Sequence, residues 1–520
     1  MFDRLATIVQ WMDGAHRLRR DRVVALIAVV FGVSAWLWGT YRYGVFGPFG
    51  SDPDIWLYSA LNIGVGAPSV GPPGYPALVW LLQQASGLSV VAAGVWVSLV
   101  SFALLPAAIY VLGRTLGLSW RSALVPAFVA PMLPELREFG HQVQPDALTT
   151  LGLTVSVILV HRAVTSASRK DWLIAVSWVG ALALLREHGM LLVFTVGTLG
   201  LFAPGSLKDR ALRCGLPLGI WWLGSCLFSA DWVLPWAAPW HRRVAMAVEA
   251  VGAVNLSVFQ GVNLPNYVIE MTTDQVEVFR SLYERDDKVG IVWFHLAHSL
   301  SSATGLWICL GLAFIGALKL DAKARLVMLA HLVVVVPTLF IWSKDRHLEV
   351  LIPVALVSVM VAVSRSPRWV LLGFVFGLGH WTAVWPHKYG VTMERLQREA
   401  VHNARVKAFG TALCELVQPG DLVAGPEMLA TLYCPLPRHT VNNDAGAADW
   451  HTWYIGRGPL GEDWHFVEVG EAIYPVRRLK PWLEGTERPC RDVLPLPNMP
   501  YHEARTVSAQ MDGECRAETF

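Results

Sequence analysis

Long uninterrupted apolar runs restrict the folds open to this chain more than any other feature of its sequence. A helix that crosses a bilayer needs about 20 largely apolar residues. Such runs recur through the first three quarters of the 520 residues, and only 16% of all residues are charged, against 54% that are hydrophobic. A soluble globular chain carries about 25% charged residues. The mean hydropathy of +0.43 agrees with an integral membrane protein.

The apolar runs predict an all-α membrane domain of about eleven transmembrane helices. Three of the runs (121–134, 172–186 and 189–203) are short, so each is tilted, extends into its flanks or forms a re-entrant hairpin packed against protein. The predicted spans are 23–40, 88–113, 121–134, 146–163, 172–186, 189–203, 214–236, 291–318, 326–342, 347–364 and 368–385.

Basic residues predict the orientation of these spans, because loops on the cytoplasmic side carry an excess of Lys and Arg. Alternate connections are basic and fall on the same side as the arginine-rich N-terminus. We therefore expect a multi-pass protein of a bacterial-type inner (plasma) membrane, with a cytoplasmic N-terminus and a periplasmic or extracellular tail. The residues concerned are Arg17, Arg19, Arg20, Arg22, Arg114, Arg121, Arg162, Arg169, Lys170, Lys208, Arg210, Arg213, Lys319, Lys323, Arg325, Arg365 and Arg368.

The expected domains are a membrane domain over residues 1–385, with outer loops at 41–87 and 237–290, and a soluble domain over residues 386–520. The soluble domain has turn signals such as Pro419-Gly420. The run 422–424 predicts a short strand and 393–417 an amphipathic helix, so a small α/β or α+β domain is expected. Its cysteines (Cys414, Cys434, Cys490 and Cys515) allow three disulfide pairings, between which the sequence does not decide.

The first outer loop carries a candidate catalytic group. Asp52 precedes Pro53, a pair typical of a helix start, and this places Asp54 in the first turn, with Tyr58 on the same face. A helix N-terminus favours an ionised carboxylate. In an arbitrary protein, two such acids more often only stabilise a helix start. A carboxylate just outside the hydrocarbon layer is also where a base acting on a lipid-linked substrate must lie.

Four motifs in order resemble a known family. They are residues 51–58 (SDPDIWLY), 71–76 (GPPGYP, with Tyr75), 142–148 (QVQPDAL, with Asp146) and 344–347 (KDRH). Together they resemble the C-type (GT-C) membrane glycosyltransferases, in the bacterial branch related to protein O-mannosyltransferases and the lipid A aminoarabinose transferase. Ile55 stands where the family's usual Asp-Glu pair has its glutamate. That departure leaves the base open between Asp54 and Asp52.

The resemblance implies an outward-facing enzyme that transfers a hexosyl or pentosyl group from a polyprenyl-phosphate donor to a glycan, lipid or protein acceptor. Asp54 would be the base, with Asp52 or Asp146 orienting the acceptor. Substrate binding would fall to Tyr58, Tyr75, Arg186, His188, Lys344 and Arg346, because cations hold the departing lipid phosphate. Arg186 lies in a segment (185–189, LREHG) where members place a basic residue at the outer end of a helix.

No cofactor and no metal ligand set is expected. His295 and His298 are three residues apart, but no acidic residue near them completes a metal site. A divalent ion is compatible with the chemistry and is not indicated. No nucleic-acid partner is expected, since the net charge is only +2.

The alternative function is a transporter or flippase of lipid-linked glycans, in which the same outer residues bind without transfer. Transporters usually show paired repeats and broken midplane helices, and neither is evident here. The sequence does not identify the sugar, the acceptor, the metal requirement or the oligomeric state.

Overall fold

A computed structural model describes residues 2–43, 72–228, 304–334 and 346–365 continuously. It also describes parts of 56–63, 277–294 and 394–412, and the strands at 422–424, 452–455, 464–469 and 472–479. The chain divides into two compact units. The first contains Met1–Gly44 and Trp96–Leu396, and the second contains Val45–Val95 and Gln397–Phe520.

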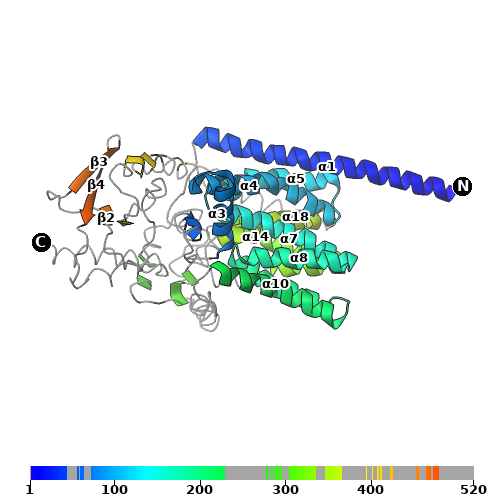
Figure 1. Ribbon diagram of the computed structural model, residues 1–520. Helices are drawn as coiled ribbons and strands as arrows, with labels where there is room; N and C mark the ends of the chain where they lie inside the picture. The colour runs from blue at the N-terminus through cyan, green and yellow to red at the C-terminus, as the bar shows by residue number, and fades with distance from the viewer. Residues whose placement is uncertain are drawn as a thin grey trace. The chain divides into compact units, whose positions relative to one another are not determined.

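The first unit is a bundle of apolar helices, whose neighbouring ribbons lie side by side in Figure 1. Its longest helix, α1, ends near the point where the first predicted span ends. The helices are α1 (Phe2–Tyr43), α4 (Val90–Thr115, which begins in the second unit), α5 (Trp120–Val129), α6 (Pro134–His141), α7 (Asp146–Ser166), α8 (Arg169–Ala183), α9 (Glu187–Phe202), α10 (Leu207–Phe228), α14 (Thr304–Leu318), α15 (Ala322–Leu332), α17 (Arg346–Glu349) and α18 (Ile352–Arg365).

The helices have the apolar character of a multi-pass membrane protein. Among the described residues, Arg19–Tyr41, Val90–Thr115 and Asp146–Ser166 are long and apolar enough to cross a membrane. They coincide with the predicted spans 23–40, 88–113 and 146–163. Shorter apolar helices cover His188–Phe202, Trp307–Leu318 and Ile352–Arg365. The predicted span 368–385 and the loop 237–290, apart from a few positions after 276, lie outside the described residues.

The predicted span 121–134 differs from the structure, because its residues form three short pieces. α5 ends at Val129, a 3-10 turn covers Ala130–Met132, and α6 then begins at Pro134. Proline cannot donate the backbone bond that a continuing helix needs, and it forces the preceding residue towards an extended conformation. Leu133 is accordingly extended, with φ −72° and ψ 134°. The prolines therefore end the helical run, and a separate polar helix begins at its last residue.

α14 and α18 cross closely. A Cβ on Gly316 would lie 2.0 Å from the backbone oxygen of Ser358. The Ser358 hydroxyl donates to the carbonyl of Ala313 at 2.6 Å. Only glycine allows this approach, so the two helices contact each other through their backbones.

We expect Gly316→Ala to lower the free energy of unfolding by about 1–3 kcal/mol, the usual cost of overpacking a core. Gly311→Ala is the matched control on the same helix, since a Cβ there meets nothing within 4 Å. The control should be neutral or stabilising, because alanine favours helix over glycine. Thermal unfolding of the detergent-purified protein measures both. Equal melting temperatures for the two variants would contradict the close crossing.

The second unit contains a mixed four-stranded sheet in the order β1-β2-β4-β3. β1 (Leu422–Ala424) pairs parallel with β2 (Thr452–Ile455), which pairs antiparallel with β4 (Ala472–Leu479). β3 (Trp464–Val469) and β4 form an antiparallel pair. The strand expected at 422–424 is confirmed by β1. Whether the domain is α/β or α+β stays a prediction.

The second unit also contains α3 (Gly74–Ser86), which follows the two prolines of the first outer loop. Proline before and within the first turn is well tolerated, because the first N–H groups of a helix have no partner within it. α3 ends at Gly87, whose φ of +70° suits glycine. These residues were expected to lie in the outer loop 41–87.

Candidate functional site

A buried ion pair joins two of the predicted site residues. Nη2 of Arg186 donates to Oδ2 of Asp146 at 2.7 Å. The Asp146 side chain is 1% exposed and the Arg186 side chain 5%. The two residues are 40 positions apart in sequence. The fold therefore brings together a predicted acceptor-orienting carboxylate and a predicted phosphate-binding arginine.

The local sequence explains how each partner is placed. Pro145 precedes α7, so Asp146 occupies its first turn, where the helix dipole favours a negative charge. Arg186 is the residue before α9 and has an extended backbone, with φ −159° and ψ 160°. It thus follows the end of α8 and reaches across to the neighbouring helix start. α7 and α9 both begin at this end of the bundle.

Further polar side chains on α7 lie beside the pair. Thr149 follows Asp146 by three residues, which places both on one face of the helix. Both are fully buried. Within the described part of the chain, neither Oδ1 of Asp146 nor the hydroxyl of Thr149 has a hydrogen-bond partner. Thr150 instead donates to the backbone oxygen of Asp146 at 2.7 Å. One carboxylate oxygen and one hydroxyl thus remain for another polar group.

His188 lies in the first turn of α9, two residues after Arg186, and is fully buried. A buried imidazole needs a polar partner. Its predicted contact with substrate stays a prediction. The side chain of Glu187, between the two, lies outside the described residues.

The helix α6 adds polar groups that sequence reasoning missed. Arg137 and His141 are almost fully buried, and Nε2 of Gln142 donates to Glu138. α6 packs against α7 and α17. The prediction ended a membrane span at residue 134 and placed residues 135–145 in the connection that follows. Three ionisable residues at 135, 137 and 138 agree with a segment that is not itself a lipid-facing span.

His141 fastens α6 to α1. Its ring stacks on Trp36, with the ring centroids 5.7 Å apart, and its Nδ1 lies 2.7 Å from the oxygen of Arg137. Trp36 in turn donates to the oxygen of Gly140 at 2.8 Å. Burial lowers the pKa of His141 to about 4, against the smaller raising effect of its backbone contacts. The ring is therefore neutral at physiological pH.

The structure describes only some of the other predicted site residues. Asp52, Asp54, Tyr58 and Lys344 lie outside the described residues, as do His295 and His298. Arg346 begins α17, whose contact with α6 brings its backbone to this end of the bundle. In the described residues, no group of three or more His, Cys, Asp or Glu side chains could hold a metal ion.

Tyr75 belongs to the second unit and is fully buried at the start of α3. Its hydroxyl lies 3.5 Å from the backbone oxygen of Gly94, and its ring meets Trp56 edge to face at 6.2 Å. These contacts give Tyr75 a packing role within the second unit. Its predicted contact with substrate stays a prediction.

Chemically, the Asp146–Arg186 pair offers a carboxylate in a fixed position. A buried charge is costly unless it is paired. Arg186 pairs with Asp146 through Oδ2, and Oδ1 of Asp146 can accept a further hydrogen bond. Arginine carries five N–H donors. Its bond to Asp146 is therefore compatible with the predicted contact with phosphate.

Comparison with known proteins places this site within a matched segment. Residues 70–223 match the model of the dolichyl-phosphate-mannose-protein mannosyltransferase family. The match includes Tyr75, Asp146, Arg186 and His188. None of the curated protein sequences matches the chain.

Among solved structures, the chain is similar to the oligosaccharyltransferase of Archaeoglobus fulgidus in complex with Zn and sulfate, at 13% identity and a TM-score of 0.43. The alignment covers 72% of this chain and 53% of the archaeal one, so the chain spans about half of that relative. It is also similar to ArnT from Cupriavidus metallidurans in the apo state, at 15% identity and a TM-score of 0.44, over 82% of this chain and 85% of that one.

The same ArnT bound to undecaprenyl phosphate matches at 14% identity and a TM-score of 0.41, over 81% of this chain and 85% of that one. These low TM-scores describe loose likenesses in shape. The family match rests instead on the sequence of the segment that builds the buried pair. Over residues 70–223, the chain is related to the dolichyl-phosphate-mannose-protein mannosyltransferases, in agreement with the GT-C resemblance of its motifs.

Proposed function

We propose that this protein is a membrane glycosyltransferase that moves a sugar from a polyprenyl-phosphate donor to an acceptor outside the cytoplasm. The observation that carries the proposal is the buried Asp146–Arg186 pair at 2.7 Å, inside the segment that matches the mannosyltransferase family. A fully buried carboxylate with one oxygen lacking a hydrogen bond among the described residues is unusual for a purely structural pair. A substrate hydroxyl would supply the missing donor.

In this proposal Asp54 removes the proton from the acceptor hydroxyl as the new glycosidic bond forms. The bond between the sugar and the lipid phosphate breaks, and the phosphate leaves with the bonding electrons. Asp146 accepts a hydrogen bond from a substrate hydroxyl through Oδ1, and Arg186 holds that carboxylate in place. A general base typically contributes 10²–10⁴-fold to the rate.

Cations are required because the lipid phosphate becomes more negative as it departs. Arg346 and Lys344 are the proposed phosphate ligands, and guanidinium groups suit phosphate because they offer two parallel donors. α17 brings the backbone of Arg346 close to α6, on the side of the bundle where α7 begins. The proposed reaction takes place at the outer face, which follows from the basic connections on the opposite face.

The test is a transfer assay with the full-length protein in detergent, supplied with a polyprenyl-phosphate sugar and a panel of glycan, lipid and peptide acceptors. We expect an acceptor-dependent product and stoichiometric release of polyprenyl phosphate, both detected by mass spectrometry. Vesicles that contain the protein and a labelled lipid-linked glycan distinguish the alternative. Movement of the labelled lipid between leaflets without any transfer product would identify a flippase and refute the proposed reaction.

A further inference from the structure

A cluster of arginines surrounds Trp120 at the end of the bundle where α5 begins. The guanidinium carbon of Arg20, on α1, lies 5.7 Å from the centroid of the Trp120 ring. That of Arg121 lies 5.3 Å from the same centroid. Both arginines are exposed, and Trp120 is half-buried. Two cationic groups from different helices are thus held on one aromatic ring, which we call the Trp120 cluster.

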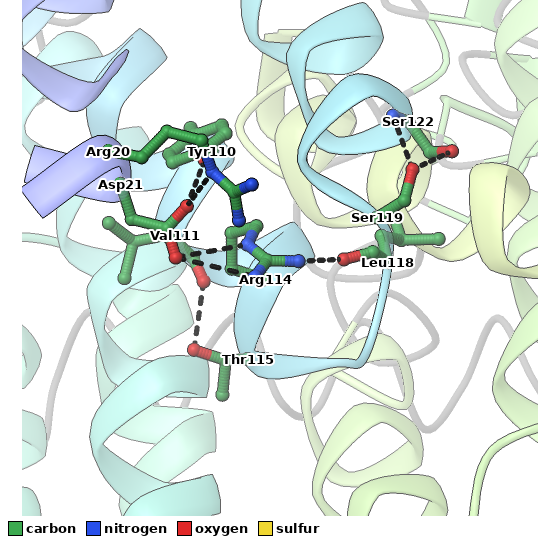
Figure 2. A network of polar contacts seen from close by, with 9 residues as sticks. All are labelled: Arg20, Asp21, Tyr110, Val111, Arg114, Thr115, Leu118, Ser119 and Ser122. Atoms are coloured by element: carbon green, nitrogen blue, oxygen red, sulfur yellow. Dashed lines mark hydrogen bonds and ion pairs between the residues drawn. The ribbon is translucent and has the colours of Figure 1, made fainter. Parts of the chain in front are cut away.

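Asp21, the residue after Arg20, bonds to two side chains of α4 (Figure 2). Its Oδ1 accepts from the hydroxyl of Tyr110 at 2.7 Å, and its Oδ2 accepts from Nε and Nη2 of Arg114, each at 3.3 Å. Arg114 also donates through Nη1 to the oxygen of Leu118, in the turn before α5. α1, α4 and the start of α5 are therefore joined through one carboxylate. These bonds hold the ends of α1 and α5, which carry Arg20 and Arg121, in fixed positions relative to each other.

The internal bonds leave a surplus of positive charge. Residues 19–22 and 110–125, at this end of α1, α4 and α5, contain five arginines and a single acidic residue, Asp21. Their formal net charge is therefore +4. Nε of Arg20 lies 3.7 Å from Asp21, a long contact for an exposed pair. Arg121 makes no ion pair with any described residue.

The position of the cluster matches the headgroup layer of a membrane. On α1 the large exposed side chains are apolar from Val23 to Tyr41, and they begin directly after Arg22. At 1.5 Å per residue this band is about 28 Å long, close to the thickness of a bilayer's hydrocarbon core. On α5, Val125 and Val129 are exposed beyond the arginines. The Trp120 cluster thus lies where lipid-facing surface gives way to polar surface, which is where tryptophan is enriched.

We propose that the Trp120 cluster is a binding site for the phosphate headgroup of an acidic phospholipid in the adjoining leaflet. Arg20 and Arg121 bind the phosphate oxygens, Trp120 packs against the glycerol backbone, and the exposed valines contact the acyl chains. The site is separate from the Asp146–Arg186 pair and does not depend on the proposed transfer reaction. The net charge of the headgroup determines which lipid binds. An acidic headgroup is attracted to the surplus of arginines, whereas a zwitterionic headgroup has no net charge.

The test measures binding of phosphatidylglycerol and phosphatidylcholine to the delipidated full-length protein, by native mass spectrometry in detergent. We expect Arg20→Gln combined with Arg121→Gln to weaken phosphatidylglycerol binding by about thirtyfold, since each basic residue near an anionic surface contributes about fivefold. Lys170→Gln combined with Arg210→Gln is the matched control, because it removes two exposed charges at other helix ends. This control should change the affinity by less than about twofold.

Two further measurements separate a lipid site from simpler explanations. Trp120→Leu keeps every charge but removes the ring that holds the guanidinium groups, so it should also weaken phosphatidylglycerol binding. Excess inorganic phosphate should fail to displace the lipid, because it lacks the glycerol and acyl contacts. Each variant must elute as a single folded species. Equal binding of phosphatidylcholine, full displacement by phosphate, or an equal loss in the control pair would each overturn the proposal.

Discussion

Asp54→Asn is expected to lower the rate of sugar transfer by about two to four orders of magnitude, the contribution of a general base. The amide has nearly the same shape as the carboxylate and can still accept a hydrogen bond at a helix start. It cannot take the proton of the acceptor hydroxyl. We therefore expect membrane yield and melting temperature to stay close to those of the unaltered protein. Initial rates at saturating donor and acceptor measure the effect.

Asp52→Asn is the matched control, because the two acids are two residues apart and undergo the same change. If Asp54 is the base, Asp52→Asn should cost much less activity. The reverse result, with full transfer in Asp54→Asn and none in Asp52→Asn, would assign the base to Asp52 and leave the proposed reaction intact. If neither change slowed transfer, the first outer loop would not be the catalytic centre.

The sequence predicted the parts of the fold that depend on long local patterns. Hydropathy located α1, α4 and α7, because a lipid-facing helix leaves an unbroken apolar run. It failed where proline divides such a run, because the run 121–134 forms α5, a 3-10 turn and only the first residue of α6. Composition within a short window cannot distinguish a tilted span from a short helix followed by a polar one.

The candidate site was predictable as a set of residues but not as a set of contacts. Asp146 and Arg186 were each selected by the motif around them, yet neither motif indicated that the two would bond to each other. Their contact depends on how the connection between α8 and α9 meets the start of α7, which is a property of packing. Thr149 had no sequence signal beyond its spacing of three from Asp146. His141 was missed because its stacking partner, Trp36, lies more than a hundred residues earlier.

Substituting only one partner of the buried Asp146–Arg186 pair is expected to destabilise the protein strongly. Asp146→Asn leaves the buried guanidinium of Arg186 without its carboxylate, and Arg186→Met leaves the carboxylate of Asp146 without its cation. Removing one partner of a buried pair typically costs about 3–5 kcal/mol. We expect each single variant to lower the melting temperature markedly. Arg162→Met is the control, because Arg162 is 69% exposed in its 2.9 Å pair with Asp171, and such pairs are worth at most about 1 kcal/mol.

The double variant, Asp146→Asn with Arg186→Met, separates a structural role from a functional one. Removing both charges abolishes the unpaired charge, so most of the lost stability should return, and the two single effects should not add. Transfer should nevertheless stay low, because the carboxylate proposed to hold the substrate hydroxyl is still missing. Recovery of both stability and transfer would make the pair purely structural. A double variant as unstable as the sum of the singles would instead show that the two side chains do not act on each other, contrary to the 2.7 Å contact.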